Sequence, residues 1–230
     1  MDILVTGGLS GIGKGIVAAF PGRCVVWSRR TGVDVTDAAQ VSAAAARLLR
    51  EHGAPQALVH CVGDFAERNL LATDDALWHE LVASNLTSSL LLARALVPAM
   101  VAAGRGRVLL FAAAGADDLR GKMRAPAYFA CKAALISLAR SLALEVARAG
   151  VTVNVLSPGI IRHPTSHAAS QERMTARIPM GRPGAVADVV GAVRWLLSPE
   201  AAYVTGAVLD VDGGLASGSA APFTAPEARD

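Results

Sequence analysis

The sequence predicts a doubly wound α/β fold, in which one parallel sheet of about seven strands carries helices on both faces. Three observations predict it. Strand-like and helix-like segments alternate about seven times, the strand-like runs are nearly all apolar, and a glycine-rich loop follows the first of them. Strands that are apolar on both sides are typical of a parallel sheet covered by helices. At 230 residues, the chain can bury the core of one such domain.

The elements follow from short apolar runs, which predict strands, and from longer segments with capping residues, which predict helices. In the first half we expect a strand at 3–5, a helix at 14–20, strands at 23–27 and 33–35, a helix from Thr36 or Asp37 to 52, a strand at 57–60, a helix from Thr73 or Asp74, and a helix at 85–103.

The second half continues the same alternation. We expect a strand at 107–112, a helix at 126–149, a strand at 151–156, a long connection at 157–184, a helix at 185–197 and a strand at 207–211. Residues 1–216 are therefore expected to form one domain, and the small residues and prolines of 217–230 predict a flexible C-terminal tail.

Composition excludes several classes of protein. The net charge is +3 and the basic residues are spread along the chain, which argues against a nucleic-acid surface. The apolar stretches are interrupted by charged, polar or glycine residues, so we expect no membrane span. Met1 and Asp2 lead directly into a strand, so we expect no signal peptide. The three cysteines are far apart, which predicts free thiols, no metal site and a cytoplasmic protein.

The loop after the first strand reads T-G-x-x-x-G-x-G and opens a helix. Glycines let the backbone approach a pyrophosphate, and the helix N-terminus supplies free N–H groups. We therefore expect dinucleotide binding rather than an ordinary turn, with contacts from Gly7, Ser10, Gly11, Ile12 and Gly13.

Further motifs occur in a fixed order along the chain. They are Asn85 within Ser84-Asn85-Leu86, the pair Tyr128-x-x-x-Lys132, the turn Ser157-Pro158-Gly159, and Tyr203-Val204-Thr205-Gly206 followed by Val211-Asp212-Gly213-Gly214. With the glycine loop, they make the chain from about residue 3 to 215 resemble the short-chain dehydrogenase/reductase family. The resemblance implies a Rossmann-like fold, a nicotinamide cofactor, and Tyr128, Lys132 and Asn85 as catalytic residues. It also implies a homotetramer or homodimer formed through the helices at 85–103 and 126–149.

The end of the second strand indicates which nicotinamide cofactor binds. Ser28, Arg29 and Arg30 follow it, where an acidic residue would favour NAD(H). A guanidinium binds phosphate in bidentate fashion, so we expect NADP(H); the alternative is that both arginines are solvated. The resemblance implies further cofactor contacts from Asp34, Val35, Gly63, Lys132, Pro158, Gly159 and Ile161. Asp34 has a second interpretation as a helix cap.

Tyr128 and Lys132 are four residues apart on a predicted helix and therefore share a face. A nearby ammonium lowers the pKa of a phenol, which is near 10 in water. We expect Tyr128 to exchange a proton with a carbonyl oxygen while hydride reaches the carbon. The resemblance implies that Lys132 also binds the nicotinamide ribose and that Asn85 holds a water in the proton relay.

The chain departs from the family at the serine that usually orients the substrate oxygen. Alanine, at Ala112 or Ala113, stands at the end of that strand, and no Ser or Thr occurs between residues 90 and 136. Three explanations are open: Asp117 or Asp118 replaces the serine, the substrate needs no serine, or the protein does no redox chemistry. His60 also replaces a family asparagine, and we interpret it as a buried, hydrogen-bonded histidine.

The long connection at 157–184 is expected to cover the substrate. Its basic side chains could meet an anionic substrate, or they could belong to a solvated lid; the candidates are Arg162, His163, Met174 and Arg177. The leading interpretation is an NADPH-dependent carbonyl reductase acting on a small molecule. The alternatives are a non-redox enzyme of the same fold (a dehydratase, cyclase or isomerase) and an NADP-binding partner subunit without catalysis.

Overall fold

A computed structural model of the chain describes residues 2–162 and 175–217. Its strands are β1 (Ile3–Thr6), β2 (Cys24–Trp27), β3 (Ala57–His60), β4 (Gly106–Phe111), β5 (Val151–Pro158) and β6 (Val208–Val211). Its helices are α1 (Gly11–Ala19), α2 (Ala38–His52), α3 (Asp75–Val82), α4 (Ser88–Ala102), α5 (Pro126–Val146) and α7 (Val186–Leu196).

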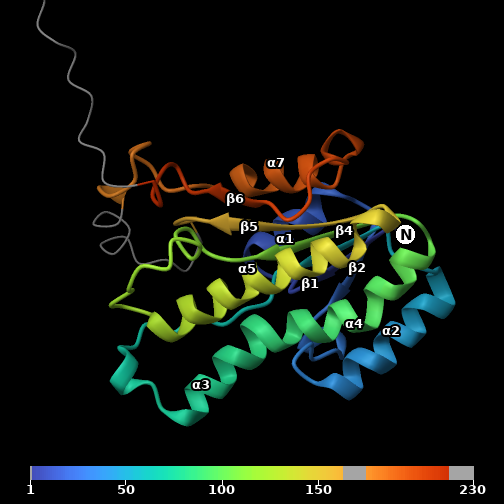
Figure 1. The fold of residues 1–230 in the computed structure, drawn as a ribbon, viewed down its shortest axis with the longest axis horizontal. Coiled ribbons are helices and arrows are strands. Elements are labelled where there is room, and N and C mark those ends of the chain that lie inside the picture. Colours follow the sequence, from blue (N-terminus) through green and yellow to red (C-terminus); the bar gives the residue numbers. More distant parts are fainter. Residues whose placement is uncertain (1, 163–174, 218–230) are drawn as a thin grey trace, which may run out of the picture.

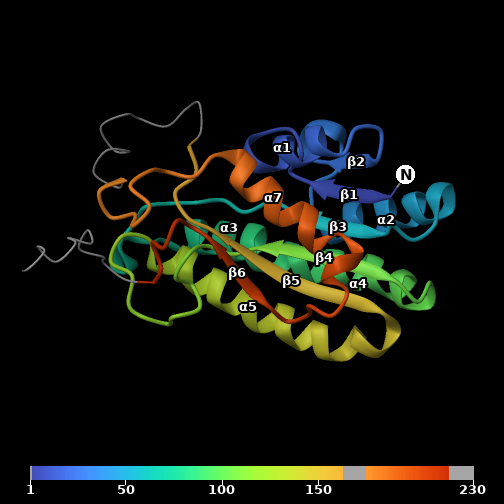
Figure 2. The same cartoon turned by 90° about the horizontal axis from the view of Figure 1, so that it is seen from above.

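The strands form one parallel sheet in the order β2-β1-β3-β4-β5-β6. The helices α2, α4 and α5 bury one set of strand side chains, and α1 and α7 bury the alternate set. Figures 1 and 2 show the sheet between these two layers. The predicted α/β fold with helices on both faces is confirmed.

The described residues hold six strands rather than the seven expected, because the segment 33–35 is not a strand. Val33 and Val35 are buried, which explains the apolar pattern. Their segment pairs with no strand, since the amide of Val33 donates to Ser28 O and the amide of Asp34 donates to Gln40 Oε1. The prediction was wrong because two buried valines can pack under a helix as well as in a sheet. Asp37, not Asp34, caps α2.

The two helices expected after residue 73 form one continuous helix from Asp75 to Ala102. A π-helical segment, Ala83–Thr87, joins α3 to α4 and includes Asn85. Short π segments are frequent at functional sites, because the extra residue in the turn redirects the side chains around it. Here the segment buries Ser84 and Asn85.

This 28-residue helix is long and apolar enough to cross a membrane, which the sequence did not lead us to expect. In the fold it packs against the sheet, and Leu92, Leu96 and Met100 are fully buried in the core. Its apolar character is therefore explained by its place between the sheet, α2 and α5.

His60 ends β3 and is buried beneath the glycine loop. Its Nδ1 lies 2.6 Å from Thr6 Oγ1, and its Nε2 lies 2.9 Å from Ser88 Oγ. Because the Ser88 hydroxyl donates to Ser84 O, His60 must donate from Nε2 and accept at Nδ1 from Thr6. The interpretation as a buried, hydrogen-bonded histidine is confirmed, and the chain of contacts joins β1 to the helix that holds Asn85.

We expect His60 to make stability depend on pH. Burial lowers its pKa from 6.5 to about 3, with the Lys132 charge adding to the effect. The unfolded chain therefore binds a proton between about pH 6.5 and 3 that the folded chain does not, so stability falls as the pH falls. Between pH 7 and 5 this loss amounts to about 2 kcal/mol in the free energy of unfolding.

The measurement is urea denaturation at pH 7 and pH 5 for the parent chain, His60→Gln and His79→Gln, whose histidine is exposed. His60→Gln should be less stable at pH 7 but should lose less between the two pH values. An unchanged pH dependence in His60→Gln would contradict the prediction.

Candidate active site

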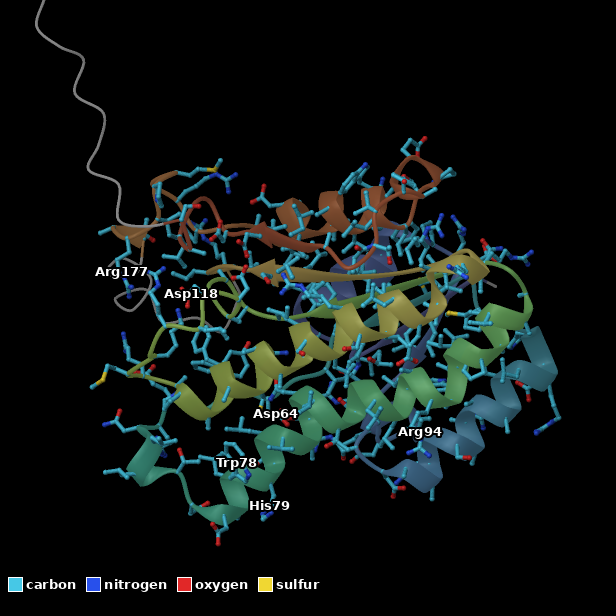
Figure 3. All side chains as sticks on the ribbon, in the orientation of Figure 1. Asp64, Trp78, His79, Arg94, Asp118 and Arg177 are labelled. Atoms are coloured by element: carbon cyan, nitrogen blue, oxygen red, sulfur yellow. The ribbon has the colours of Figure 1, made fainter. Side chains whose placement is uncertain are left out.

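The candidate active site lies at the carboxyl ends of the strands, where the connections of a doubly wound sheet leave room for a ligand. Figure 1 shows these ends at the left, where the arrows of β5 and β6 point. The loop before α5, which carries Asp118, and the segment before α7, which carries Arg177, come to this end of the molecule (Figure 3).

The glycine loop joins β1 to α1, as predicted, although the helix begins at Gly11 rather than near residue 14. Ser10 is its N-cap residue, and its side chain makes no capping hydrogen bond. A side chain on Gly13 would collide with the carbonyl of Gly7, so the turn requires glycine there. The loop presents the start of α1 without a covering side chain and fits a pyrophosphate.

Asn85, Lys132 and Gly63 meet at the end of β3. A Cβ atom on Gly63 would lie 2.5 Å from Asn85 Oδ1 and 3.0 Å from Lys132 Nζ, so only glycine fits. The amide nitrogen of Asn85 donates to Asp64 O at 2.9 Å and Leu81 O at 3.0 Å. Its Oδ1 is buried and has no hydrogen-bond partner among the described residues. This acceptor beside an ammonium fits the water-holding role that the resemblance implies.

Lys132 is buried, and its Nζ donates to Phe111 O, the last carbonyl of β4, at 2.6 Å. Burial lowers the pKa of Lys132 to about 8. The ammonium therefore remains charged at neutral pH, but it can lose its proton more readily than a solvated lysine.

Tyr128 lies one turn before Lys132 on α5, and the Lys132 Nζ is 5.6 Å from the centroid of its ring. The expected lowering of its pKa is wrong for this structure, since burial raises the pKa of Tyr128 to about 12. The reason is geometric: the ammonium lies over the ring and bonds to Phe111 O. Tyr128 is thus held in its neutral form, which is the form that donates a proton.

The predicted phosphate-binding residues follow β2. Arg29 and Arg30 form a short exposed 3₁₀ turn, and among the described residues neither joins an ion pair. The Ser28 hydroxyl accepts from Thr31 N and caps this turn. Asp34 accepts from the amide and hydroxyl of Thr36, and these bonds lower the pKa of its carboxyl.

The turn after β5 also lies at this end. The amide of Gly159 donates to Val211 O, which places Pro158 and Gly159 beside β6, and Ile161 bridges to Gly184 in the segment before α7. Arg162 and Arg177 are exposed. His163 and Met174, the other lid candidates, lie outside the described residues.

Neither aspartate expected near the serine position forms a hydrogen bond with Tyr128 in the described residues. Asp118 is held by Arg120 and Lys122, with the Lys122 Nζ at 3.0 Å. Asp117 is exposed and borders a surface cavity of about 270 Å³ along α5, with Ser137 and Leu144. The arrangement gives no support to either aspartate as a replacement for serine.

Three neighbours of the site were not found from the sequence. In the parallel pairing of β4 and β5, Phe111 lies opposite Leu156. The next residues along the two strands, Ala112 and Ser157, are therefore neighbours. Its hydroxyl is buried, and no residue in the part of the chain that the structure describes forms a hydrogen bond with it. Phe65 and Phe129 pack edge-on against Tyr128. Ser157 and Phe129 stand inside motifs given above, but the sequence assigned neither of them a role, and the only signal for Phe65 was its closeness to Gly63.

Comparisons with known proteins identify the family of the chain. A family model described as enoyl-(acyl carrier protein) reductase matches residues 10–216. The chain is 34% identical over 187 residues to the 3-oxoacyl-[acyl-carrier-protein] reductase of Escherichia coli, covering 80% of this chain and 75% of that protein. The chain belongs to the short-chain dehydrogenase/reductase family.

Two further relatives cover nearly the whole chain. A galactitol 2-dehydrogenase of Cereibacter sphaeroides is 35% identical over 237 residues, covering 91% of this chain and 92% of that protein. The crystal structure of a short-chain dehydrogenase/reductase candidate from Burkholderia xenovorans has a TM-score of 0.84 at 29% identity, covering 94% of this chain and 96% of that one.

The fold is also that of ElxO with NADP bound, with a TM-score of 0.87 at 23% identity over 94% of this chain and 98% of that one. At this identity the likeness shows a shared fold.

Proposed function

We propose that the protein is an NADPH-dependent carbonyl reductase that transfers hydride to a ketone or related polarised double bond of a small molecule. The observation that carries this proposal is the convergence of Asn85 and Lys132 at Gly63, with the ring of Tyr128 beside Lys132, at the carboxyl edge of the sheet. The names of the relatives, a ketoacyl carrier reductase and a polyol dehydrogenase, support C=O and CH–OH chemistry.

The residues at this edge fit a nicotinamide dinucleotide. The glycine loop would hold the pyrophosphate, and Arg29 with Arg30 would bind a 2′-phosphate. Asp34 and Val35 would lie near the adenine, while Gly63, Pro158, Gly159 and Ile161 would line the nicotinamide end. When bound, the cofactor supplies the hydride.

The chain's own residues would manage the proton. Tyr128 is neutral because burial raises its pKa, so its O–H can donate to a carbonyl oxygen as the carbon is reduced. Lys132, charged but with a lowered pKa, would bind ribose hydroxyls and return a proton to the phenolate. Asn85 would hold a water at its free Oδ1, linking Lys132 to solvent.

The replacement of serine by alanine favours a second candidate, a non-redox enzyme of the same fold. Tyr128 could then do acid–base work in a dehydratase, cyclase or isomerase. We prefer the reductase because Arg29 and Arg30 are exposed and join no ion pair among the described residues, which leaves both guanidinium groups accessible to the 2′-phosphate of NADPH. We also propose a cytoplasmic homotetramer or homodimer, since Leu90 on α4 and Leu144 on α5 are exposed.

Tyr128→Phe should lower kcat for ketone reduction by at least about 100-fold, because a positioned general acid contributes about 10²–10⁴ in rate. The measurement is NADPH consumption at 340 nm with an activated diketone, with NADPH binding measured by titration. Tyr203→Phe, a fully exposed tyrosine, is the control. Product formation at unchanged NADPH would favour the non-redox enzyme; full activity of Tyr128→Phe would contradict the proposed role.

The double variant Arg29→Ala/Arg30→Ala should weaken NADPH binding about tenfold or more, because it removes charge-assisted bonds to the 2′-phosphate. NADH binding should change less than about twofold. The exposed arginines of α2 provide a control, Arg47→Ala/Arg50→Ala. Equal weakening of both cofactors would show that the arginines do not select NADPH.

Ala112→Ser should raise kcat on an unactivated ketone such as cyclohexanone by about 10-fold or more, since one oxyanion donor contributes about 10²–10³ in other enzymes. Ala112 is chosen because it lies on the face of β4 that packs against α5. Ala113→Ser, one residue on, is the matched control. Failure of both variants to gain activity would show that a missing hydroxyl is not what limits the site.

A further inference from the structure

Two phenylalanines bracket the ring of Tyr128. The centroid of Phe65 lies 5.1 Å from that of Tyr128, and the centroid of Phe129 lies 5.5 Å away; both pairs have an interplanar angle of 85°. These are edge-to-face contacts of the kind that aromatic rings prefer. Phe129 is the neighbour of Tyr128 on α5, whereas Phe65 comes from a distant segment, the loop between β3 and α3.

The loop that presents Phe65 is fixed to the catalytic machinery. The amide of Asp64 donates to Ser84 Oγ at 3.2 Å, and Asp64 O accepts from the Asn85 side chain at 2.9 Å. Farther along, Glu67 pairs with Arg124 at 2.6 Å, which joins the loop to the segment before α5. Figure 3 labels Asp64, the residue next to Phe65. Phe65 is therefore held on both sides, although 61% of it is exposed.

An exposed phenylalanine held in this way has a free surface available to a ligand. Its ring covers one side of Tyr128 and presents the remainder to solvent at the end of the molecule where the reaction would occur. Because this side chain is fixed beside the candidate proton donor, its exposed face offers an apolar surface against which a flat group can pack.

The residues at the end of β4 are also apolar. β4 ends in Phe111 and continues into Ala112, Ala113 and Ala114, and no hydroxyl amino acid other than Tyr128 occurs between residues 90 and 136. Tyr128 is thus the single O–H donor that β4, its loop and the first turns of α5 supply. A carbonyl bound here would depend on apolar contact for its position and on one phenol for its proton.

These features select a substrate class. With Tyr128 as the one hydroxyl donor from these segments, the carbonyl reduced most easily is one whose carbon is already electron-poor, because less negative charge on oxygen needs stabilising. A flat aromatic group gains most from the free surface of Phe65. We propose that Phe65 determines specificity, by packing against the aromatic ring of an aryl ketone activated by a second carbonyl, such as an aryl α-diketone. This inference rests on the proposed reductase function.

The reaction balances as an ordinary reduction. Hydride from NADPH forms a C–H bond at one carbonyl carbon, the C=O π pair moves to oxygen, and the Tyr128 O–H proton forms the new hydroxyl. NADPH is oxidised to NADP⁺, the diketone is reduced to an α-hydroxy ketone, and Tyr128 regains its proton from solvent.

The test compares 1-phenyl-1,2-propanedione with 2,3-hexanedione, two diketones that differ mainly in the aryl ring. Steady-state kinetics would be measured for the parent chain, Phe65→Leu, Phe65→Tyr and Leu71→Ala; Leu71 is a fully exposed residue of the same loop. We expect Phe65→Leu to raise KM for the aryl diketone about five- to tenfold, with kcat little changed. The aliphatic diketone should change less than about twofold, and Phe65→Tyr should behave as the parent chain.

Several outcomes would overturn the inference. An equal loss on both diketones would show that Phe65 supports Tyr128 or the fold rather than the substrate. If Phe65→Leu changed KM for neither diketone, or if Leu71→Ala raised KM for the aryl diketone equally, Phe65 would have no role in substrate specificity. Turnover of 2,3-hexanedione that is lost in Tyr128→Phe would still support the reductase. If neither diketone caused NADPH to be oxidised, the result would contradict the proposed function and, with it, this inference.

Discussion

The ammonium of Lys132 is buried at the carboxyl edge of the sheet, where it donates to the last carbonyl of β4. A buried charge is unfavourable unless polar groups surround it, and the surrounding elements are arranged to supply them. The π segment brings the free oxygen of Asn85 to the same point, and Gly63 lets both side chains approach the backbone. Tyr128 lies above this cluster, on the helix turn before the lysine.

The buried polar chain from Thr6 through His60 to Ser88 stabilises the same region from below. It connects the strand before the glycine loop to the helix that holds Asn85, so the cofactor end and the catalytic end share one scaffold. A histidine can serve here because its ring makes two directional bonds and stays neutral when buried. Fully bonded buried networks of this kind favour one arrangement of the strands over others.

Alanines after β4 and aromatic rings around Tyr128 give the proton-donating end of the site an apolar character. The alanines and the aromatic rings both reduce the number of polar contacts that this end of the site offers a substrate. Loss of a hydroxyl donor leaves the phenol as the main polar contact from these segments, and burial raises the pKa of Tyr128. The site is thereby suited to a substrate that is already reactive and that binds through its apolar surface.

The sequence by itself determined the α/β fold, the glycine loop and the order of the catalytic motifs, because apolar period, glycine spacing and a Tyr–Lys pair on one helix face are local properties. It misassigned 33–35, because burial of alternate valines does not distinguish a strand from a loop under a helix. Only the tertiary structure decided that the lysine bonds to Phe111 O rather than lowering the pKa of Tyr128, that Ser157 lies beside Ala112, and that Phe65 meets Tyr128. Each of these depends on how segments distant in sequence come together, and no local pattern records those distances.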